Sequence, residues 1–304
     1  QKFAMQADLA DAQSALAKAQ LSRETATAWL DRTITQKLRD LTLARLEENQ
    51  RLLGSAEAGF RSGRESQTSV FDARLAIERT RDRLDEIDRE LAIATTTLER
   101  WVGAVAEHSP GEMPALVWRN TEAVSERQLT HPELAVAQAR IKVAEAQARV
   151  AETAQQSDWT MGLTYGRRGA IFGDAISLRV SIPWQLNRQA VQTEQWLASR
   201  ERINASELRR KELTRTEVSR IETLAASLRF LNKRLARYRF RMLPLAEQRA
   251  EASLAAYSGG SATLSAVLMA RRAQLDLQLE ELALERRAAR VWAELEYLEG
   301  EKAQ

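Results

Sequence analysis

The chain has 304 residues, of which 29% are charged and 44% hydrophobic, with only 12 glycines and 5 prolines. This composition is typical of long helices and coiled coils. The net charge of +3 arises from interleaved acidic and basic residues, which argues against a nucleic-acid-binding protein, and the absence of cysteine excludes disulfides and thiolate metal sites. No apolar run reaches the ~18 residues that a membrane-spanning helix needs.

The first hundred residues predict a helical hairpin. Residues 3–59 contain no proline and one internal glycine, Gly54, and predict one long helix. Residues 65–102 predict its return partner, because they carry a coiled-coil seam with 3-4 spacing: Leu84, Ile87, Leu91, Ala94, Leu98 and Trp101. We therefore assign residues 1–102 to a first helical hairpin with its tip near residues 60–66.

Residues 103–129 interrupt this pattern. They contain Gly103, Pro110, Gly111 and Pro114, and they predict a linker that packs beside the helices. A helix restarts over 130–157, where Thr130 is a candidate N-cap, Glu133 completes a capping box and Pro132 suits the first turn.

The period changes from helical to alternating near residue 158. We predict that residues 158–187 form a β-hairpin with strands of about ten residues, the length of a tilted transmembrane strand. Its large apolar residues fall on one face, which we interpret as facing a membrane: Trp159, Met161, Leu163, Tyr165, Ile176, Leu178, Val180, Ile182 and Trp184.

A lone hairpin of this kind needs partners, because it is marginal in water and its open edges are not viable in lipid. Aromatic residues at both of its ends resemble the two girdles of an outer-membrane barrel. The alternative is a soluble hairpin that packs one face on a helix. Barrel closure would require oligomerisation, a second hairpin upstream, or both.

The remainder of the chain, 188–304, is predicted to be helical. An unbroken 3-4 seam runs from Ile221 to Met242, and Pro244 is expected to kink the helix that carries it. A turn near residues 257–263 precedes a final helix over about 262–299. Together with 130–157, this segment forms a second set of long helices.

The two turns belong to an internal repeat. A shift of 197 residues places Phe60 on Tyr257, Gly63 on Gly260 and Val70 on Val267, and upstream it places Leu38 on Leu235. A duplication of this length predicts an architecture built from two similar halves.

Catalytic chemistry finds no support in the sequence. The only histidines are His108, in the linker, and His131, beside a proline at a helix start. There is no Ser/His/Asp grouping, no phosphate-binding loop and no pair with metal-ligand spacing. We therefore predict neither an enzyme nor a cofactor or metal site.

Three stretches resemble the outer membrane efflux protein family, the TolC-like exit ducts of tripartite pumps. Leu243-Pro-Leu-Ala-Glu247 followed by residues 255–272 is similar to the family's Leu-Pro-x-Ala-Glu helix and its Tyr-x-x-Gly tip with Val-Leu-x-Ala-Arg. His131-Pro-Glu-Leu134 resembles the start of a family helix. Ser177–Pro183 followed by Asn187-Arg-Gln189 resembles the strand exit of the heavy-metal subgroup, the CzcC- and CusC-like proteins.

The resemblance implies a homotrimer in the outer membrane of a Gram-negative cell. Each protomer would contribute four strands to a β-barrel and its long antiparallel helices to an α-barrel tunnel in the periplasm. Its partners would be a periplasmic adaptor and an inner-membrane transporter of the RND type, and its cargo would be heavy-metal cations. The first β-hairpin and a signal peptide are then expected upstream of residue 1.

The resemblance also assigns roles to residues. The adaptor would dock on the two tips, at Phe60, Arg61, Gly63, Arg64, Ser66, Tyr257, Gly259, Gly260, Ser261 and Thr263. Some relatives carry acidic residues just beyond the second tip, which narrow the entrance. The matching positions here are Ala266 and Met269, with Asp72 in the first repeat, so the candidate gate departs from that pattern.

Two other classes of protein remain as alternatives. A soluble coiled-coil scaffold would use the hairpin for dimerisation, but it has no need for aromatic residues at both ends. A basic helical nucleic-acid binder would concentrate Lys and Arg on one stripe, whereas Glu and Asp interrupt them throughout.

Overall fold

The computed structural model describes residues 2–108, 111–117, 131–153, 160–167, 175–181 and 188–298. The chain forms two compact units, one of residues 1–18 with 122–218 and one of residues 19–121 with 219–304. Two long helices, α1 (Lys2–Arg61) and α5 (Arg188–Arg237), contribute to both units.

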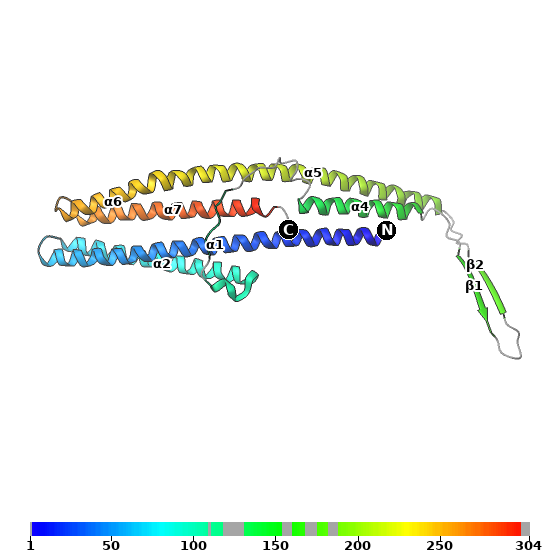
Figure 1. Ribbon diagram of the computed structural model, residues 1–304, viewed down its shortest axis with the longest axis horizontal. Helices are drawn as coiled ribbons and strands as arrows, with labels where there is room; N and C mark the ends of the chain where they lie inside the picture. The colour runs from blue at the N-terminus through cyan, green and yellow to red at the C-terminus, as the bar shows by residue number, and fades with distance from the viewer. Residues whose placement is uncertain are drawn as a thin grey trace. The chain divides into compact units, whose positions relative to one another are not determined.

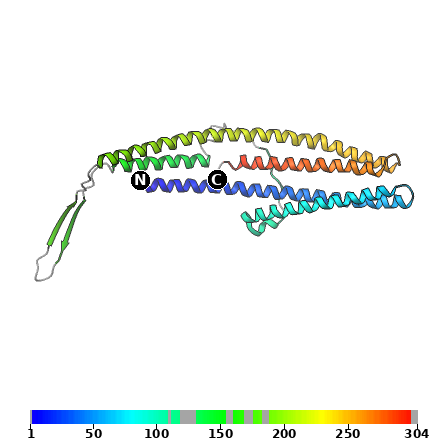
Figure 2. The same cartoon turned by 180° about the vertical axis from the view of Figure 1, so that it is seen from behind.

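The second unit contains two helical hairpins. The first is α1 with α2 (Gln67–Val102), and the second is α6 (Leu243–Ser258) with α7 (Leu264–Glu296). The turns of both hairpins lie at the same end of this unit (Figure 1, and Figure 2 from behind). The predicted long helix, its return partner, the final helix and both tips are thus confirmed, with boundaries within a few residues.

The seam of α1 follows a strict 3-4 spacing. Its buried positions are Thr35, Leu38, Thr42, Arg45, Asn49, Leu52, Ala56 and Gly59. The polar members are paired: the Asn49 side-chain amide donates to Thr80 Oγ1 at 2.9 Å, and Thr42 Oγ1 donates to the Leu38 carbonyl at 2.8 Å. Polar residues at core positions of a coiled coil fix the register of the helices.

The seams predicted on α2 and α5 are also confirmed. Ile87 and Leu98 of α2 are buried, as are Ile221, Leu228 and Leu235 of α5. The main hydrophobic core joins α1, α2, α5 and α7 around Leu30, Ile34, Ile87 and Leu284. Burying each such side chain contributes about 1.5–3 kcal/mol.

At Pro244, where we expected a kink, the hydrogen-bonding pattern of the helix changes. Directly before it lies a π-helical turn, η2 (Tyr238–Met242), whose cap is the Leu243 N–H donating to the Tyr238 carbonyl. Proline has no N–H to continue the α-helical pattern, and the wider turn accommodates this loss. The Arg239 guanidinium binds Glu281 at 2.6 Å and Glu285 at 3.0 Å, which holds the turn against α7.

The linker begins with a short 3-10 helix, η1 (Gly103–Glu107), and the described part of its remainder, 111–117, is not helical. Met113 and Leu116 pack against the main core, and Asn232 donates to the Leu116 carbonyl at 3.1 Å. This part of the linker packs beside the helices as predicted.

In the first unit, α4 (Pro132–Thr153) is the predicted restarting helix. Thr130 lies outside the described residues. His131 Nδ1 accepts a hydrogen bond from the Glu133 N–H at 3.3 Å, so the imidazole caps the first turn of α4. The buried His131 Nε2 lies 3.3 Å from Glu217 of α5, which joins the start of α4 to that helix.

The same unit carries an antiparallel hairpin of β1 (Thr160–Gly166) and β2 (Ala175–Ser181). Each strand has seven described residues, and residues 154–159, 168–174 and 182–187 beside them lie outside the described part of the chain. None of the helices that the structure describes is long and apolar enough to cross a membrane.

Candidate functional site

The turn between α1 and α2 is a Schellman motif. The Gly63 N–H donates to the Phe60 carbonyl at 3.0 Å, and the Arg64 N–H donates to the Gly59 carbonyl at 2.9 Å. Gly63 has φ +70°, a conformation that favours glycine. Ser66 then caps α2, because its side chain accepts a hydrogen bond from the Ser69 N–H.

The turn between α6 and α7 repeats these interactions 197 residues later. The Gly260 N–H donates to the Tyr257 carbonyl at 3.0 Å, and the Ser261 N–H donates to the Ala256 carbonyl at 2.9 Å. Gly260 has φ +76°, and Thr263 caps α7 by accepting from the Ala266 N–H. The two predicted tips are therefore matched in backbone structure as well as in sequence.

One pair of side chains distinguishes the two turns. A Cβ on Gly59 would lie 2.6 Å from Glu65 Cγ, so the Glu65 side chain occupies the space that glycine leaves free. The equivalent positions of the second turn carry Ala256 and Ala262. The residue that matches Gly59 is therefore larger in the second turn, and the residue that matches Glu65 is smaller. The same turn is thus packed in two ways.

The two tips are held together by a small core. It contains Leu52, Ala56, Val70, Ala73, Leu264 and Val267, with Tyr257 packed against it. Burial and a hydrogen bond with Glu65 raise the pKa of Tyr257. This hydrogen bond connects the second tip to the first. Apart from half-buried Tyr257, the predicted docking residues are exposed: Phe60, Arg61, Gly63, Arg64, Ser66, Gly259, Gly260, Ser261 and Thr263.

Two of the three candidate gate residues come together above the tips. Asp72 of α2 and Met269 of α7 line a hollow of about 650 Å³ between these helices. Ala266 is not among the residues that line this hollow. Its N–H donates a hydrogen bond to the side chain of Thr263, the N-cap of α7. We refer to this hollow as the α2–α7 groove.

A charged cluster at the base of this groove was missed by the sequence analysis. Arg45 and Arg271 share one carboxylate, Glu48: Arg45 Nη1 contacts Glu48, and Arg271 Nε lies 2.8 Å from it. Gln274 accepts from both arginines, at 3.4 Å and 3.0 Å. Burial lowers the pKa of Arg45. The signal was the position of Arg45 on the α1 seam, where a charged residue is unusual.

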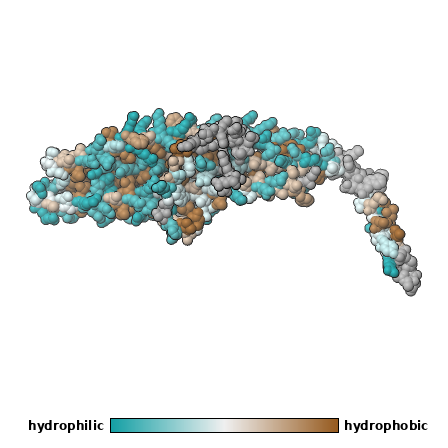
Figure 3. Space-filling model, viewed as in Figure 1, coloured by the Kyte–Doolittle hydropathy of each residue, from teal (hydrophilic) through white to brown (hydrophobic). Residues whose placement is uncertain are grey.

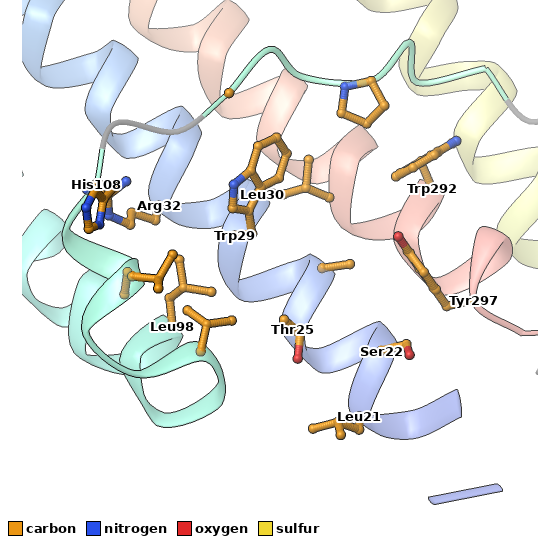
Figure 4. Close-up of a pocket in the computed structure, with 16 residues that line it drawn as sticks. Leu21, Ser22, Thr25, Trp29, Leu30, Arg32, Leu98, His108, Trp292 and Tyr297 are labelled. Carbon is orange, nitrogen blue, oxygen red and sulfur yellow. The ribbon is translucent and has the colours of Figure 1, made fainter. Parts of the chain in front are cut away.

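A second hollow of about 630 Å³ lies at the other end of this bundle. Trp29 and Leu30 project into it from α1, Trp292 and Tyr297 from the end of α7, and Leu98 from α2 (Figure 4). Arg32 holds η1 beside it by donating to the Glu107 carbonyl at 3.2 Å. This aromatic hollow also lay outside the sequence-based prediction.

The hairpin places its apolar residues as predicted. The register pairs Met161 with Val180, Leu163 with Leu178 and Tyr165 with Ile176, so these side chains share one face. All six are exposed, and hydrophobic surface follows the hairpin in Figure 3. Trp159, Ile182 and Trp184 lie outside the described residues.

No family model matches this sequence, and no curated protein matches it either. Solved structures do match. The outer-membrane channel OprN is 18% identical with a TM-score of 0.84, and the match covers 99% of this chain and 70% of that one. The outer membrane protein VceC from Vibrio cholerae is 19% identical with a TM-score of 0.82, covering 98% and 74% of the two chains.

The fold is that of an outer-membrane channel. CusC, whose structures describe folding and transmembrane channel formation, matches at 17% identity with a TM-score of 0.81, and 98% of this chain is covered. CusC is thus about as similar as OprN and VceC. The comparisons support the channel fold without separating a heavy-metal subgroup from the others.

Proposed function

We propose that this chain is the protomer of an outer-membrane exit duct in a tripartite efflux pump of a Gram-negative cell. Three copies form a tunnel of helices in the periplasm and a β-barrel in the outer membrane. Substrate moves passively through this duct, and an inner-membrane transporter supplies the energy. No side-chain chemistry is required of the protein.

One observation carries this proposal: nearly the whole chain matches outer-membrane channels in fold. The hairpin adds independent support. Its six described apolar side chains are between 48% and 73% exposed, and a face of this kind requires lipid or further protein. Two exposed strand edges also require pairing partners, which further hairpins of a trimer supply.

We further propose that the two tips bind a periplasmic adaptor. The support is that both tips are exposed, lie at one end of their unit and share the same rigid turn. Replacing Gly63 or Gly260 with a bulky residue is expected to abolish pump function while leaving the amount of outer-membrane protein unchanged. Unchanged function would remove the tips from the docking surface.

The proposed cargo is a heavy-metal cation, on the basis of the strand-exit resemblance at Ser177–Pro183. A strain that lacks this protein is expected to lose tolerance to metals such as cobalt, zinc, cadmium, nickel, copper or silver, and to regain it from a plasmid copy. Loss of tolerance to organic drugs alone would assign the duct to a different cargo.

Conduction is tested directly with the purified full-length protein in planar lipid bilayers. Discrete single-channel currents are expected. A protein that inserts into these bilayers without conducting would contradict the duct.

A further inference from the structure

The α2–α7 groove lies on a hollowed face of the second unit. Arg45 and Asn49 of α1 form its base, and its walls are one face of α2 and one face of α7. On α2 the lining positions are 72, 75, 76, 79, 80 and 83, and on α7 they are 265, 268, 269, 272, 275, 276 and 279. The three helices therefore form a layer in which α1 is set back between its neighbours, and this face of the layer is concave.

The edges of this layer offer a second copy more contact than the groove does. One edge is α2, and the other is formed by α5, η2 and α6, which lie beyond α7 (Figures 1 and 2). Both edges expose large apolar side chains that do not line the groove: Phe71 and Ile93 on α2, and Phe230 and Phe240 on the other edge.

The charges of the two edges are also opposite. Asp82 and Asp85 are exposed on α2, and Lys233, Arg237 and Arg241 are exposed on the other edge. Copies that meet edge to edge would cover the apolar side chains and pair these charges. Contacts of this head-to-tail kind close into a ring, and the groove stays open in that ring.

The groove itself is positively charged. Four arginines line it: Arg45, Arg79, Arg83 and Arg272. The lining contains only two carboxylates, those of Asp72 and Asp276. Arg83 is paired with Glu86, but Arg79 and Arg272 are exposed and have no ion pair with another described residue. The two walls therefore each present an arginine that is free to contact an anion.

The buried base of the groove adds to this charge. Arg45 is 7% exposed, and its Nε has no hydrogen-bond partner among the described residues. Arg45 and Arg271 share the single carboxylate of Glu48. With Arg271 and the contacting Glu48 and Glu86 included, five arginines face four carboxylates. A buried cation that lacks a full complement of acceptors favours an anion nearby.

We propose that the α2–α7 groove is an anion site on the tunnel wall, which makes the duct conduct anions in preference to cations. A ring of copies turns its concave face inward, so the arginines of three copies surround one passage. Rings of arginine or lysine select anions in a pore, and a cleft lined by one sign of charge concentrates the opposite ion.

This inference rests on the proposed duct and adds the charge of what passes through it. Oxyanions and carboxylates are the ions that guanidinium groups bind best. A metal cation would pass the groove as a complex of net negative charge with such ligands.

The test measures the ion selectivity of the purified full-length protein in planar lipid bilayers. With KCl more concentrated on one side, the reversal potential gives the ratio of chloride to potassium permeability. Chloride is expected to pass about three times more readily than potassium, with the preference reduced at high salt, because salt screens the arginine charges. A duct that prefers potassium, or that has no preference, would overturn the proposal.

The double variant Arg79→Glu/Arg272→Glu is expected to reverse the preference. The matched control is Arg74→Glu/Arg81→Glu, which makes the same change of charge at two exposed arginines of α2 outside the groove, each in a surface ion pair. The control is expected to keep the chloride preference. A preference that survives the first variant, or that is lost in the control, would contradict the anion site.

The native mass of both variants separates the charge of the tunnel wall from contacts between copies. Both are expected to keep the oligomer of the unaltered protein. Dissociation of the Arg79→Glu/Arg272→Glu variant alone would assign these arginines to contacts between copies, which also overturns the proposal. A conducting protein that prefers cations contradicts only the anion site, whereas a protein that inserts without conducting contradicts the duct itself.

Discussion

Three glycines are expected to affect the stability of this chain in opposite directions. Gly63 and Gly260 have positive φ and open space where a Cβ would lie, so their requirement comes from the backbone rather than from packing. Gly54 lies inside α1, also with open space, and its φ is not in the left-handed region.

We predict that Gly63→Ala and Gly260→Ala each lower the free energy of unfolding by about 1–2 kcal/mol, the cost of a left-handed conformation for alanine. Gly54→Ala is the control and is expected to raise it by about 0.5–1 kcal/mol, because alanine favours the helix. Denaturant unfolding in detergent measures all three. Equal effects at Gly54 and Gly63 would contradict the turn geometry.

The contact between Gly59 and Glu65 supports a second prediction. Gly59→Ala places a methyl group against the Glu65 side chain and is expected to destabilise the first tip by about 1–3 kcal/mol. Glu65→Ala should remove the contact with Glu65 Cγ, leaving Cβ at 3.2 Å, and reproduce the Ala256/Ala262 pair of the second tip. A double-mutant cycle measures this coupling. Additive effects of the two substitutions would show that Glu65 does not fill the space at Gly59.

At the scale of the elements, the helices and the hairpin register could be predicted because they follow from side-chain period. The 3-4 seams of α2 and α5, and the apolar face of β1 and β2, each depend on residues a few positions apart. The π turn was not predicted because Pro244 forbids a regular helix without specifying how the chain responds.

The interactions that join distant segments were also missed. The sequence gives no indication that Arg45 and Arg271 meet at Glu48, or that His131 caps α4 and reaches Glu217. Such pairs depend on how the helices pack. A charged residue at a coiled-coil core position is the one local signal that could have pointed to Arg45.

The hairpin face provides the prediction at this scale. Leu178→Arg is expected to block insertion into the outer membrane, since arginine on a lipid-facing strand costs about 2–4 kcal/mol near the bilayer centre, in each protomer. Ser177→Arg is the matched control, because it places the same charge on the opposite face of β2. The amount of each variant in outer-membrane fractions measures the effect. Equal insertion of both variants would mean that the Leu178 face does not contact lipid.

For the whole molecule, every proposed role depends on assembly. A tunnel, a closed barrel and a ring of docking tips all require several copies of this chain, and the exposed apolar hairpin requires lipid. A soluble coiled-coil scaffold requires neither. The native mass of the full-length natural protein, measured with and without detergent, therefore tests the central claim most directly. We predict a homotrimer that stays in solution only in detergent. A monomer or dimer that is stable in plain buffer would contradict the duct and favour the scaffold.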